Sequence, residues 1–323
     1  MLRILNAEPD GYASAASQIL SEVGHVDHRA VDRSELLADI AKYDAVIVRL
    51  GHRIDRAVFK AAPRLLAVAT ATTGLDHIDV DEATRRGVAV VSLKGETEFL
   101  RSIPATAELT WGLILALTRR IPEALDAVRR GRWCRDACIG VDLYGRTLGL
   151  VGCGRVGEKV ARYGLAFGMR ISAFDPFRHT LPEGVHSCSS LLALARESDI
   201  VSVHVPFSLE TKNLIDGDFL AAMRPGAYLV NTSRGGVVCE AALVEALDTG
   251  RLAGAALDVL TNERGLLAGG RHAVTQAMQA RANLLITPHI GGASMESMRA
   301  TEVFIAGKLR ALLAQRCSAS DGR

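Results

Sequence analysis

The stretch TLGLVGCGRVGEKVA, residues Thr147–Ala161, joins a short apolar run to a helical pattern through three glycines. Gly152 would allow a tight exit from a β-strand, and Gly157 would let the following helix pack closely on the sheet. Gly154 would let the backbone approach a pyrophosphate, while the N–H groups at the start of the helix attract phosphate oxygens. The stretch therefore predicts a dinucleotide-binding turn between a strand and a helix.

The residues after this helix indicate which dinucleotide is bound. A second predicted strand, Arg170–Phe174, ends at Asp175, which lies 18 residues beyond Gly157. An acidic side chain here accepts hydrogen bonds from the adenosine ribose hydroxyls and repels a 2′-phosphate, so NAD is favoured over NADP. Arg178 leaves some room for NADPH. A glycine-rich turn without any cofactor is the alternative, and an acidic residue at this distance argues against it.

Length and composition exclude several classes of protein. The 323 residues suit two domains, and 49% hydrophobic and 23% charged residues with a net charge of +2 indicate neither disorder nor a nucleic-acid-binding surface. The first residues show no signal-peptide pattern and no apolar run is long enough to span a bilayer, so a soluble, cytoplasmic protein is expected. The six cysteines form no C-x-x-C pair and no cluster with histidines, so no structural metal is expected.

The first 95 residues alternate strand-like and helical patterns, which predicts a parallel sheet with helices on both faces. The predicted strands are Leu2–Leu5, Ala45–Val48, Leu65–Ala69 and Val88–Ser92. The predicted helices are Gly11–Val23, Arg33–Ala41, Asp55–Ala61 and Asp79–Arg86. This segment contains no glycine-rich phosphate turn, so it is expected to belong to a second domain, separate from the cofactor domain.

The same alternation resumes after a long apolar helix predicted at Ile103–Arg119. Further strands are predicted at 147–151, 170–174, 199–205, 227–231, 254–259 and 283–287, with helices at 155–167, 188–197, 216–223 and 238–248. A last helix, Ser294–Leu313, is expected to pack on the first domain. The fold class is therefore α/β, with two Rossmann-like or flavodoxin-like parallel-sheet domains and a ligand site in the cleft between them. Residues 1–98 plus 290–323 would form the substrate domain, and residues 99–289 the NAD-binding domain.

Three neighbouring strand ends carry side chains suited to oxidising an alcohol next to a carboxylate. Arg234 has a planar guanidinium that would hold the carboxylate and polarise the developing carbonyl. His289 would take the hydroxyl proton as hydride leaves for a nicotinamide. Glu263 would orient the imidazole and stabilise its charged form. Taken singly, a surface arginine or a structural histidine is the commoner case, so the three residues carry weight only together.

Four segments together resemble the D-isomer-specific 2-hydroxyacid dehydrogenases, the family that contains D-3-phosphoglycerate dehydrogenase. They are GRTLGLVGCGRVG, VNTSRGGVV, GAALDV with Glu263 five residues after Asp258, and TPHIGGAS. The resemblance also covers GLDHIDVDEA and AELTWGLILAL, and so most of the chain. It implies Arg234, Glu263 and His289 as the catalytic set, Asp258 near the nicotinamide, and a homodimer built on the nucleotide domains. It implies further cofactor contacts from Arg155, Val156, Asp175, Pro206, Thr232, Gly291 and Gly292.

The chain departs from the members that act on phosphoglycerate at the positions that read the substrate. Leu50-Gly51-His52 stands where those members usually carry Ser-Arg-Thr, so Arg53 or His52 would have to replace the missing arginine. Gly74-Leu75-Asp76 stands where Gly-Thr-Asn is usual, and Asp76 would repel an anionic substrate unless it points away or pairs with a base. The candidate substrate-binding residues are Arg53, Gly74, Leu75 and Asp76.

The expected ligands are NAD and a small anionic 2-hydroxy or 2-oxo acid, with no nucleic-acid or membrane partner. Two alternatives remain open. The C-terminal binding protein corepressors resemble this family and keep a similar catalytic set, which allows an NADH-sensing binding protein. The sequence argues mildly against this function, because no long disordered tail extends beyond the dehydrogenase core. A dehydrogenase that processes phosphonates is the other alternative.

Overall fold

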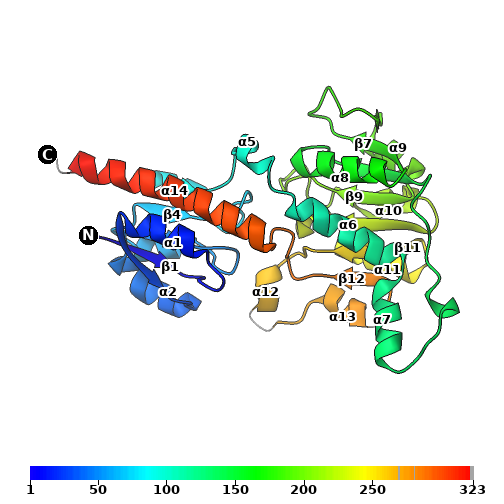
Figure 1. The fold of residues 1–323 in the computed structure, drawn as a ribbon, viewed down its shortest axis with the longest axis horizontal. Helices are drawn as coiled ribbons and strands as arrows, with labels where there is room; N and C mark the ends of the chain where they lie inside the picture. Colours follow the sequence, from blue (N-terminus) through cyan, green and yellow to red (C-terminus); the bar gives the residue numbers. More distant parts are fainter. Residues whose placement is uncertain (268–269, 280, 321–323) are drawn as a thin grey trace. The chain divides into compact units, whose positions relative to one another are not determined.

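The computed structural model describes residues 1–267, 270–279 and 281–320, and Figure 1 shows its ribbon coloured along the sequence. The chain divides into two compact units: a terminal unit, Met1–Ile103 with Ala293–Arg323, and a central unit, Pro104–Gly292. Each unit is built on an open parallel sheet with helices on both faces. The predicted α/β class with two parallel-sheet domains is therefore confirmed.

The unit boundaries differ by a few residues from the division predicted at 98/99 and 289/290. The short helix α5 (Thr97–Leu100) stays with the terminal unit because Leu100 is buried in the core of that unit. Residues 290–292 stay with the central unit because the backbone N–H groups of Ile290 and Gly291 donate hydrogen bonds to the carboxylate of Asp258.

The terminal unit contains a five-stranded sheet in the order β2-β1-β3-β4-β5, which is the flavodoxin-like order. Its parallel strands are β1 (Leu2–Asn6), β2 (Gly24–His28), β3 (Ala45–Ile47), β4 (Ala67–Ala69) and β5 (Ala89–Val91). Strand β2 was not predicted. It lies at the sheet edge with the sequence GHVDH, and Gly24 is its one buried residue, so it lacks the apolar run of an inner strand.

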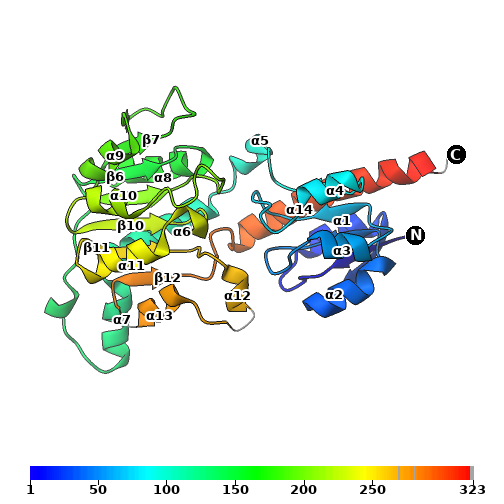
Figure 2. The ribbon, with the colours of Figure 1, turned by 180° about the vertical axis from the view of Figure 1, so that it is seen from behind.

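Two helices, α1 (Ser14–Ser21) and α14 (Met295–Ser320), pack on one face of this sheet. The other face, which Figure 2 shows from behind, is covered by α2 (Arg33–Asp39), α3 (Arg56–Ala61) and α4 (Val80–Arg85). One face of α14 carries apolar residues four positions apart: Ile305, Leu309 and Leu313. They are buried in one core with Ile4 and Leu20. The last helix therefore packs on the first part of the chain, as expected, and it continues beyond its predicted end at Leu313.

The central unit contains a seven-stranded sheet in the order β12-β11-β10-β9-β6-β7-β8. Its parallel strands are β6 (Thr147–Val151), β7 (Arg170–Phe174), β8 (Val185–Ser187), β9 (Ile200–Val203), β10 (Ala227–Asn231), β11 (Leu252–Leu257) and β12 (Leu284–Ile286). The order reverses between β6 and β9, and open sheets of this kind bind ligands at the carboxyl ends of the strands around such a point. The short, largely exposed edge strand β8 was not predicted.

Helices α6 (Ala105–Thr118) and α8 (Arg155–Ala166) cover one face of this sheet. The other face is covered by α9 (Leu191–Glu197), α10 (Gly217–Ala222), α11 (Glu240–Asp248) and α13 (Ala273–Gln279). Helix α7 (Ile121–Arg129) was not predicted, and neither were α12 (Glu263–Leu267) and α13. The last two lie around a Gly- and Ala-rich stretch in which apolar periodicity is weak.

The remaining ordered elements are short 3-10 helices at Ile40–Lys42, Asp136–Cys138 and Gly235–Val237. Within the described ranges, no helix has both the length and the apolar composition needed to cross a membrane. The same ranges contain no group of three or more His, Cys, Asp or Glu side chains arranged to hold a metal ion.

Candidate active site

The glycine turn follows β6 and opens α8. Gly152 has a φ of +87°, which costs glycine little, and a Cβ there would lie 2.8 Å from the side chain of Val205. A Cβ on Gly157 would lie 2.5 Å from the carbonyl oxygen of Gly152, so its absence lets the helix approach the strand end. At Gly154, the N-cap of α8, no atom of the described chain lies within 4 Å of the Cβ position. The turn is therefore closed on its sheet side and open at Gly154.

Arg155 places a positive charge at this helix start. It is the first residue of α8, its side chain is half-buried, and burial lowers the pKa of its guanidinium. None of the described residues forms an ion pair with it. A half-buried guanidinium that lacks a counter-charge, beside the first N–H groups of a helix, suits a phosphate group. The neighbouring Val156 packs on the core around β6.

Asp175 lies one residue beyond β7 and faces the glycine turn. Its Oδ2 accepts a hydrogen bond from the Cys153 N–H at 2.9 Å, and its Oδ1 accepts one from the Phe177 N–H at 3.0 Å. These two contacts fix the carboxylate beside the turn. Cys153 is fully buried, and burial raises the pKa of its thiol to about 11, so this thiol is protonated at neutral pH.

The loop after β10 positions Thr232 and Arg234. Asn231 is fully buried, its Nδ2 donates to the carbonyl of Arg234 at 2.9 Å, and its Oδ1 accepts from the N–H of Ser233 at 3.0 Å. The guanidinium of Arg234 donates to the carbonyl of Ser233 at 2.7 Å. The hydroxyl of Thr232 lies 2.8 Å from that of Thr110 in α6. One buried asparagine and one hydroxyl pair thus set the shape of this loop.

Gly235 brings the arginine loop against the segment that leads to Glu263. A Cβ on Gly235 would lie 2.0 Å from the carbonyl carbon of Leu260, a distance that no side chain can tolerate. The two loops therefore touch through their backbones, and this contact requires glycine at position 235.

Asp258 anchors the loop that carries His289. Its buried carboxylate accepts hydrogen bonds from the Thr287 hydroxyl at 2.6 Å and from the N–H groups of Ile290 at 2.8 Å and Gly291 at 2.7 Å. Burial raises the pKa of this carboxyl, and the three hydrogen bonds oppose that shift. The structure thus gives Asp258 a loop-holding role that the sequence did not indicate, while its contact with the nicotinamide stays a prediction.

His289 and Glu263 are hydrogen-bonded to each other. Nδ1 of His289 lies 2.7 Å from Oε2 of Glu263, and Oε1 of Glu263 accepts the N–H of Leu260 at 2.9 Å. This arrangement puts the proton on Nδ1 and leaves Nε2 for another partner. The two side chains are 23% and 30% exposed, so a ligand can reach them. The backbone of His289 has a φ of +55°, which is uncommon for a residue with a side chain.

Two residues that the sequence did not single out hold the chain just before Glu263. Glu240, at the start of α11, accepts hydrogen bonds from the N–H of Thr261 at 2.6 Å and from its hydroxyl at 2.8 Å. Nε2 of His272 lies 2.8 Å from the carbonyl oxygen of Thr261, and its Nδ1 accepts the N–H of Val274. The sequence gives little indication of these contacts with Thr261, because a glutamate at a helix start is common.

The other candidate cofactor residues lie after β9 and β12. Pro206 is exposed, and its carbonyl accepts the Thr211 hydroxyl at 2.7 Å. Burial lowers the pKa of the nearby His204 to about 3, so this histidine is neutral at physiological pH. Gly291 is buried against Asp258, whereas no described atom lies within 4 Å of the Cβ position at Gly292.

The candidate substrate residues belong to the terminal unit, in the loops after β3 and β4. Arg53 is exposed, and its carbonyl accepts a hydrogen bond from the guanidinium of Arg33 at 2.5 Å. The carbonyl of Gly74 accepts the Thr72 hydroxyl at 2.8 Å, Leu75 packs on the core of this unit, and Asp76 is exposed. Their approach to Arg234 and His289 in the other unit stays a prediction.

Glu8, after β1, organises the first of these loops. Its Oε1 accepts the N–H groups of Arg49 at 2.9 Å and His52 at 3.4 Å, and its Oε2 accepts the N–H of Gly51 at 3.2 Å. The sequence offered no signal for this contact, because its partners lie more than 40 residues apart in the chain.

Residues 111–291 match the NAD-binding domain of the D-isomer specific 2-hydroxyacid dehydrogenases. The chain belongs to this dehydrogenase family. It is 34% identical to the hydroxypyruvate reductase of Thermotoga maritima over 91% of this chain and 93% of that protein. It is also 34% identical to the D-3-phosphoglycerate dehydrogenase of Methanocaldococcus jannaschii over 97% of this chain and 58% of that protein. The chain thus spans about half the length of the curated phosphoglycerate dehydrogenases that it matches.

The dehydrogenase family is also found among solved structures. The D-lactate dehydrogenase from Aquifex aeolicus, complexed with NAD and lactic acid, superposes with a TM-score of 0.84 at 27% identity, covering 99% of this chain and 98% of that one. The family and the NAD cofactor predicted from the sequence are therefore confirmed. The roles of individual residues in the dehydrogenase site stay predictions.

Proposed function

We propose that the protein interconverts a small D-2-hydroxy acid and its 2-oxo acid with NAD(H). The observation that carries this proposal is the 2.7 Å contact between His289 and Glu263 at a strand end of the NAD-binding domain. An imidazole bonded to a carboxylate through Nδ1 can gain and lose a proton at Nε2, which is the task of an acid/base in this reaction.

Each charged residue of the site has a distinct part in the proposed reaction. In the direction of reduction, His289 would give its Nε2 proton to the carbonyl oxygen of the oxo acid. NADH, when bound, would supply the hydride that C2 receives. Glu263 stabilises the imidazolium before this transfer, and Leu260 keeps the carboxylate in place through its N–H. Arg234 holds the carboxylate of the acid with its planar fork. Oxidation of the hydroxy acid is the reverse of these steps.

The dinucleotide would lie along the carboxyl ends of β6, β7 and β9. Its pyrophosphate fits the open backbone at Gly154 and the charge of Arg155, which has no protein counter-charge among the described residues. Asp175 would accept the adenosine ribose hydroxyls, and Val156, Pro206 and Thr232 would contact the cofactor. Asp258 would act through the loop at Gly291 and Gly292, which it fixes.

The substrate is proposed at the level of a small 2-hydroxy or 2-oxo acid. The names of the relatives include hydroxypyruvate, phosphoglycerate and lactate, and the loops at 50–53 and 74–76 differ from the usual phosphoglycerate pattern. Arg53 and Asp76, both exposed in the terminal unit, would decide between an anionic and a neutral substrate side chain.

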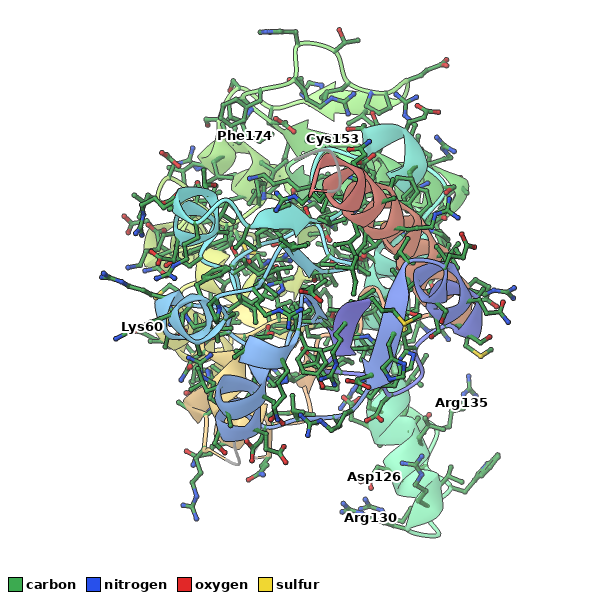
Figure 3. All side chains as sticks on the ribbon, turned by 90° about the vertical axis from the view of Figure 1, so that its left-hand side faces the viewer. Lys60, Asp126, Arg130, Arg135, Cys153 and Phe174 are labelled. Atoms are coloured by element: carbon green, nitrogen blue, oxygen red, sulfur yellow. The ribbon has the colours of Figure 1, made fainter. Side chains whose placement is uncertain are left out.

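We further propose a homodimer formed through the central unit. Helix α7 has no buried residue, and its stripe of Ile121, Leu125 and Val128 is 42%, 51% and 54% exposed. Figure 3 labels Asp126 on this helix and Arg130 directly after it, which form an ion pair at 3.0 Å. An exposed apolar stripe on a short helix suits burial against a second copy of the chain. Leu125→Glu should therefore shift the sedimentation coefficient from dimer to monomer; an unchanged coefficient would reject this interface.

The central test is loss of NADH absorbance with a panel of 2-oxo acids: pyruvate, glyoxylate, hydroxypyruvate, phosphohydroxypyruvate and phosphonopyruvate. At least one acid should turn over, and His289→Ala should lower kcat by about 10²–10⁴ while NADH still binds. His186→Ala, at an exposed histidine of edge strand β8, is the matched control and should leave turnover unchanged. No turnover with any acid, or normal turnover in His289→Ala, would contradict the proposal.

A further inference from the structure

Arg178 is folded back over the glycine turn. Residues 175–178 form a turn closed by a hydrogen bond from the N–H of Arg178 to the carbonyl of Asp175 at 3.3 Å. The guanidinium of Arg178 then donates to Oε1 of Glu158 in α8 at 2.5 Å and to the carbonyl oxygen of Cys153. Figure 3 labels Cys153, two residues beyond the end of β6, and Phe174, the last residue of the adjacent strand β7. A basic residue that could bind an anion is thus held by an acidic one.

This cluster contains two carboxylates and one guanidinium. Asp175 is fixed by the N–H groups of Cys153 and Phe177, and Glu158 is fixed by Arg178. The net charge of the three side chains is therefore negative, and a phosphate on the adenosine ribose would meet that charge. The side chains of Arg178 and Glu158 are 34% and 37% exposed, so their contact can be broken without opening the core.

We propose that Glu158, by holding Arg178 beside Asp175, contributes to the preference for NAD(H) over NADP(H), and that the freed guanidinium would bind a 2′-phosphate. This inference rests on the proposed placement of the dinucleotide along the glycine turn. Asp175 alone would repel the phosphate in any such turn. Glu158 adds a second negative charge and occupies the guanidinium of Arg178. Removing Glu158 would make the net charge of the cluster zero and release a planar fork that matches phosphate oxygens.

The experiment measures the affinities of NADH and NADPH by fluorescence titration without any oxo acid. Glu158→Gln should tighten NADPH binding about tenfold, which corresponds to about 1.4 kcal/mol, and change NADH binding little. The double variant Glu158→Gln with Arg178→Met should lose this gain. Glu245→Gln, an exposed position on α11, changes the net charge equally and should leave both affinities as in the wild type.

Three results with the variants would overturn the inference. The first is unchanged NADPH affinity in Glu158→Gln. The second and third are a gain in NADPH affinity as large as that of Glu158→Gln in the double variant or in Glu245→Gln. Because the titration needs no turnover, failure of the oxo-acid panel would reject the proposed reaction and leave this inference standing. A wild-type protein that bound neither dinucleotide would overturn both. Circular dichroism melts of each variant exclude unfolding as the cause of a lost affinity.

Discussion

Two backbone segments at strand ends, the loop after β3 in the terminal unit and the start of α8 in the central unit, differ in whether an internal carboxylate meets their N–H groups. In the terminal unit, the carboxylate of Glu8 accepts three N–H groups of the loop after β3. In the central unit, the start of α8 has no carboxylate of the described chain on Gly154, and Arg155 beside it has no described counter-charge. The same kind of strand end can therefore stabilise the fold with an internal anion or bind an external one.

This comparison separates residues that hold the fold from residues that hold a ligand. Changes at Glu8 should affect stability and spare dinucleotide binding, whereas changes at Arg155 should do the reverse. Glycines at the central turn should affect both, because they set the path of the backbone itself.

The largest effect is expected for Gly157→Val. The new Cβ would lie 2.5 Å from the carbonyl oxygen of Gly152, so α8 would have to move away from the strand end. A shift of about 1 Å in a binding turn can cost about 100-fold, and we expect kcat/KM for NADH to fall by at least that factor. Gly217→Ala, where the nearest atom would be 3.9 Å away, is the control. Comparable losses in the two variants would mean that the central turn is not special.

The next effect is expected for Arg155→Met, which keeps an unbranched, flexible stem and removes the charge. A charge-assisted hydrogen bond contributes about 1.5–3 kcal/mol, so NADH affinity should fall roughly 10- to 100-fold while the unfolding midpoint stays the same or rises. NADH titration and urea unfolding measure the two quantities. Arg170→Met, an exposed arginine at the opposite end of β7, is the matched control. Equal affinity in the wild type and Arg155→Met would remove Arg155 from the phosphate site.

A smaller effect, on stability alone, is expected for Glu8→Ala. The change leaves the N–H groups of Arg49, Gly51 and His52 without their acceptor, and the free energy of unfolding should fall by about 1–3 kcal/mol. Urea unfolding gives this value, and NADH affinity should not change. Glu22→Ala, where the glutamate pairs with Arg310 at an exposed site, should cost less than about 1 kcal/mol. Weakened NADH binding in Glu8→Ala would break the proposed separation of roles.

The last effect appears only at alkaline pH and concerns the thiol inside the central turn. Burial raises the pKa of Cys153 to about 11, above that of the unfolded chain, so the folded state binds its proton more tightly. Its contribution to stability is therefore complete below about pH 8.5 and is lost as the pH rises toward 11. The unfolding free energy of the wild type should fall faster over this alkaline range than that of Cys153→Ala. Parallel curves would mean that water reaches the interior of the turn.

Much of this architecture could be predicted from the sequence because inner parallel strands are continuous apolar runs. The glycine turn and the three strand ends with Arg234, Glu263 and His289 were named from residue type and position. The edge strands β2 and β8 were missed because both are largely exposed or half-buried. Such strands lack a continuous apolar run, so their sequences resemble those of loops. Glu8, Glu240 and His272 were missed for another reason. Each acts through hydrogen bonds to backbone groups of another segment, and backbone groups leave no mark in the sequence.

The left-handed backbone of His289 has a consequence for protein engineering. A φ of +55° costs glycine little and costs histidine more, although histidine is among the residues with a side chain that are enriched there. Variants selected for thermal stability alone would therefore favour Gly at position 289, and that gain would remove the imidazole that the proposed reaction needs. At this position a library would show stability and turnover as opposing traits, with histidine retained only when activity is part of the selection.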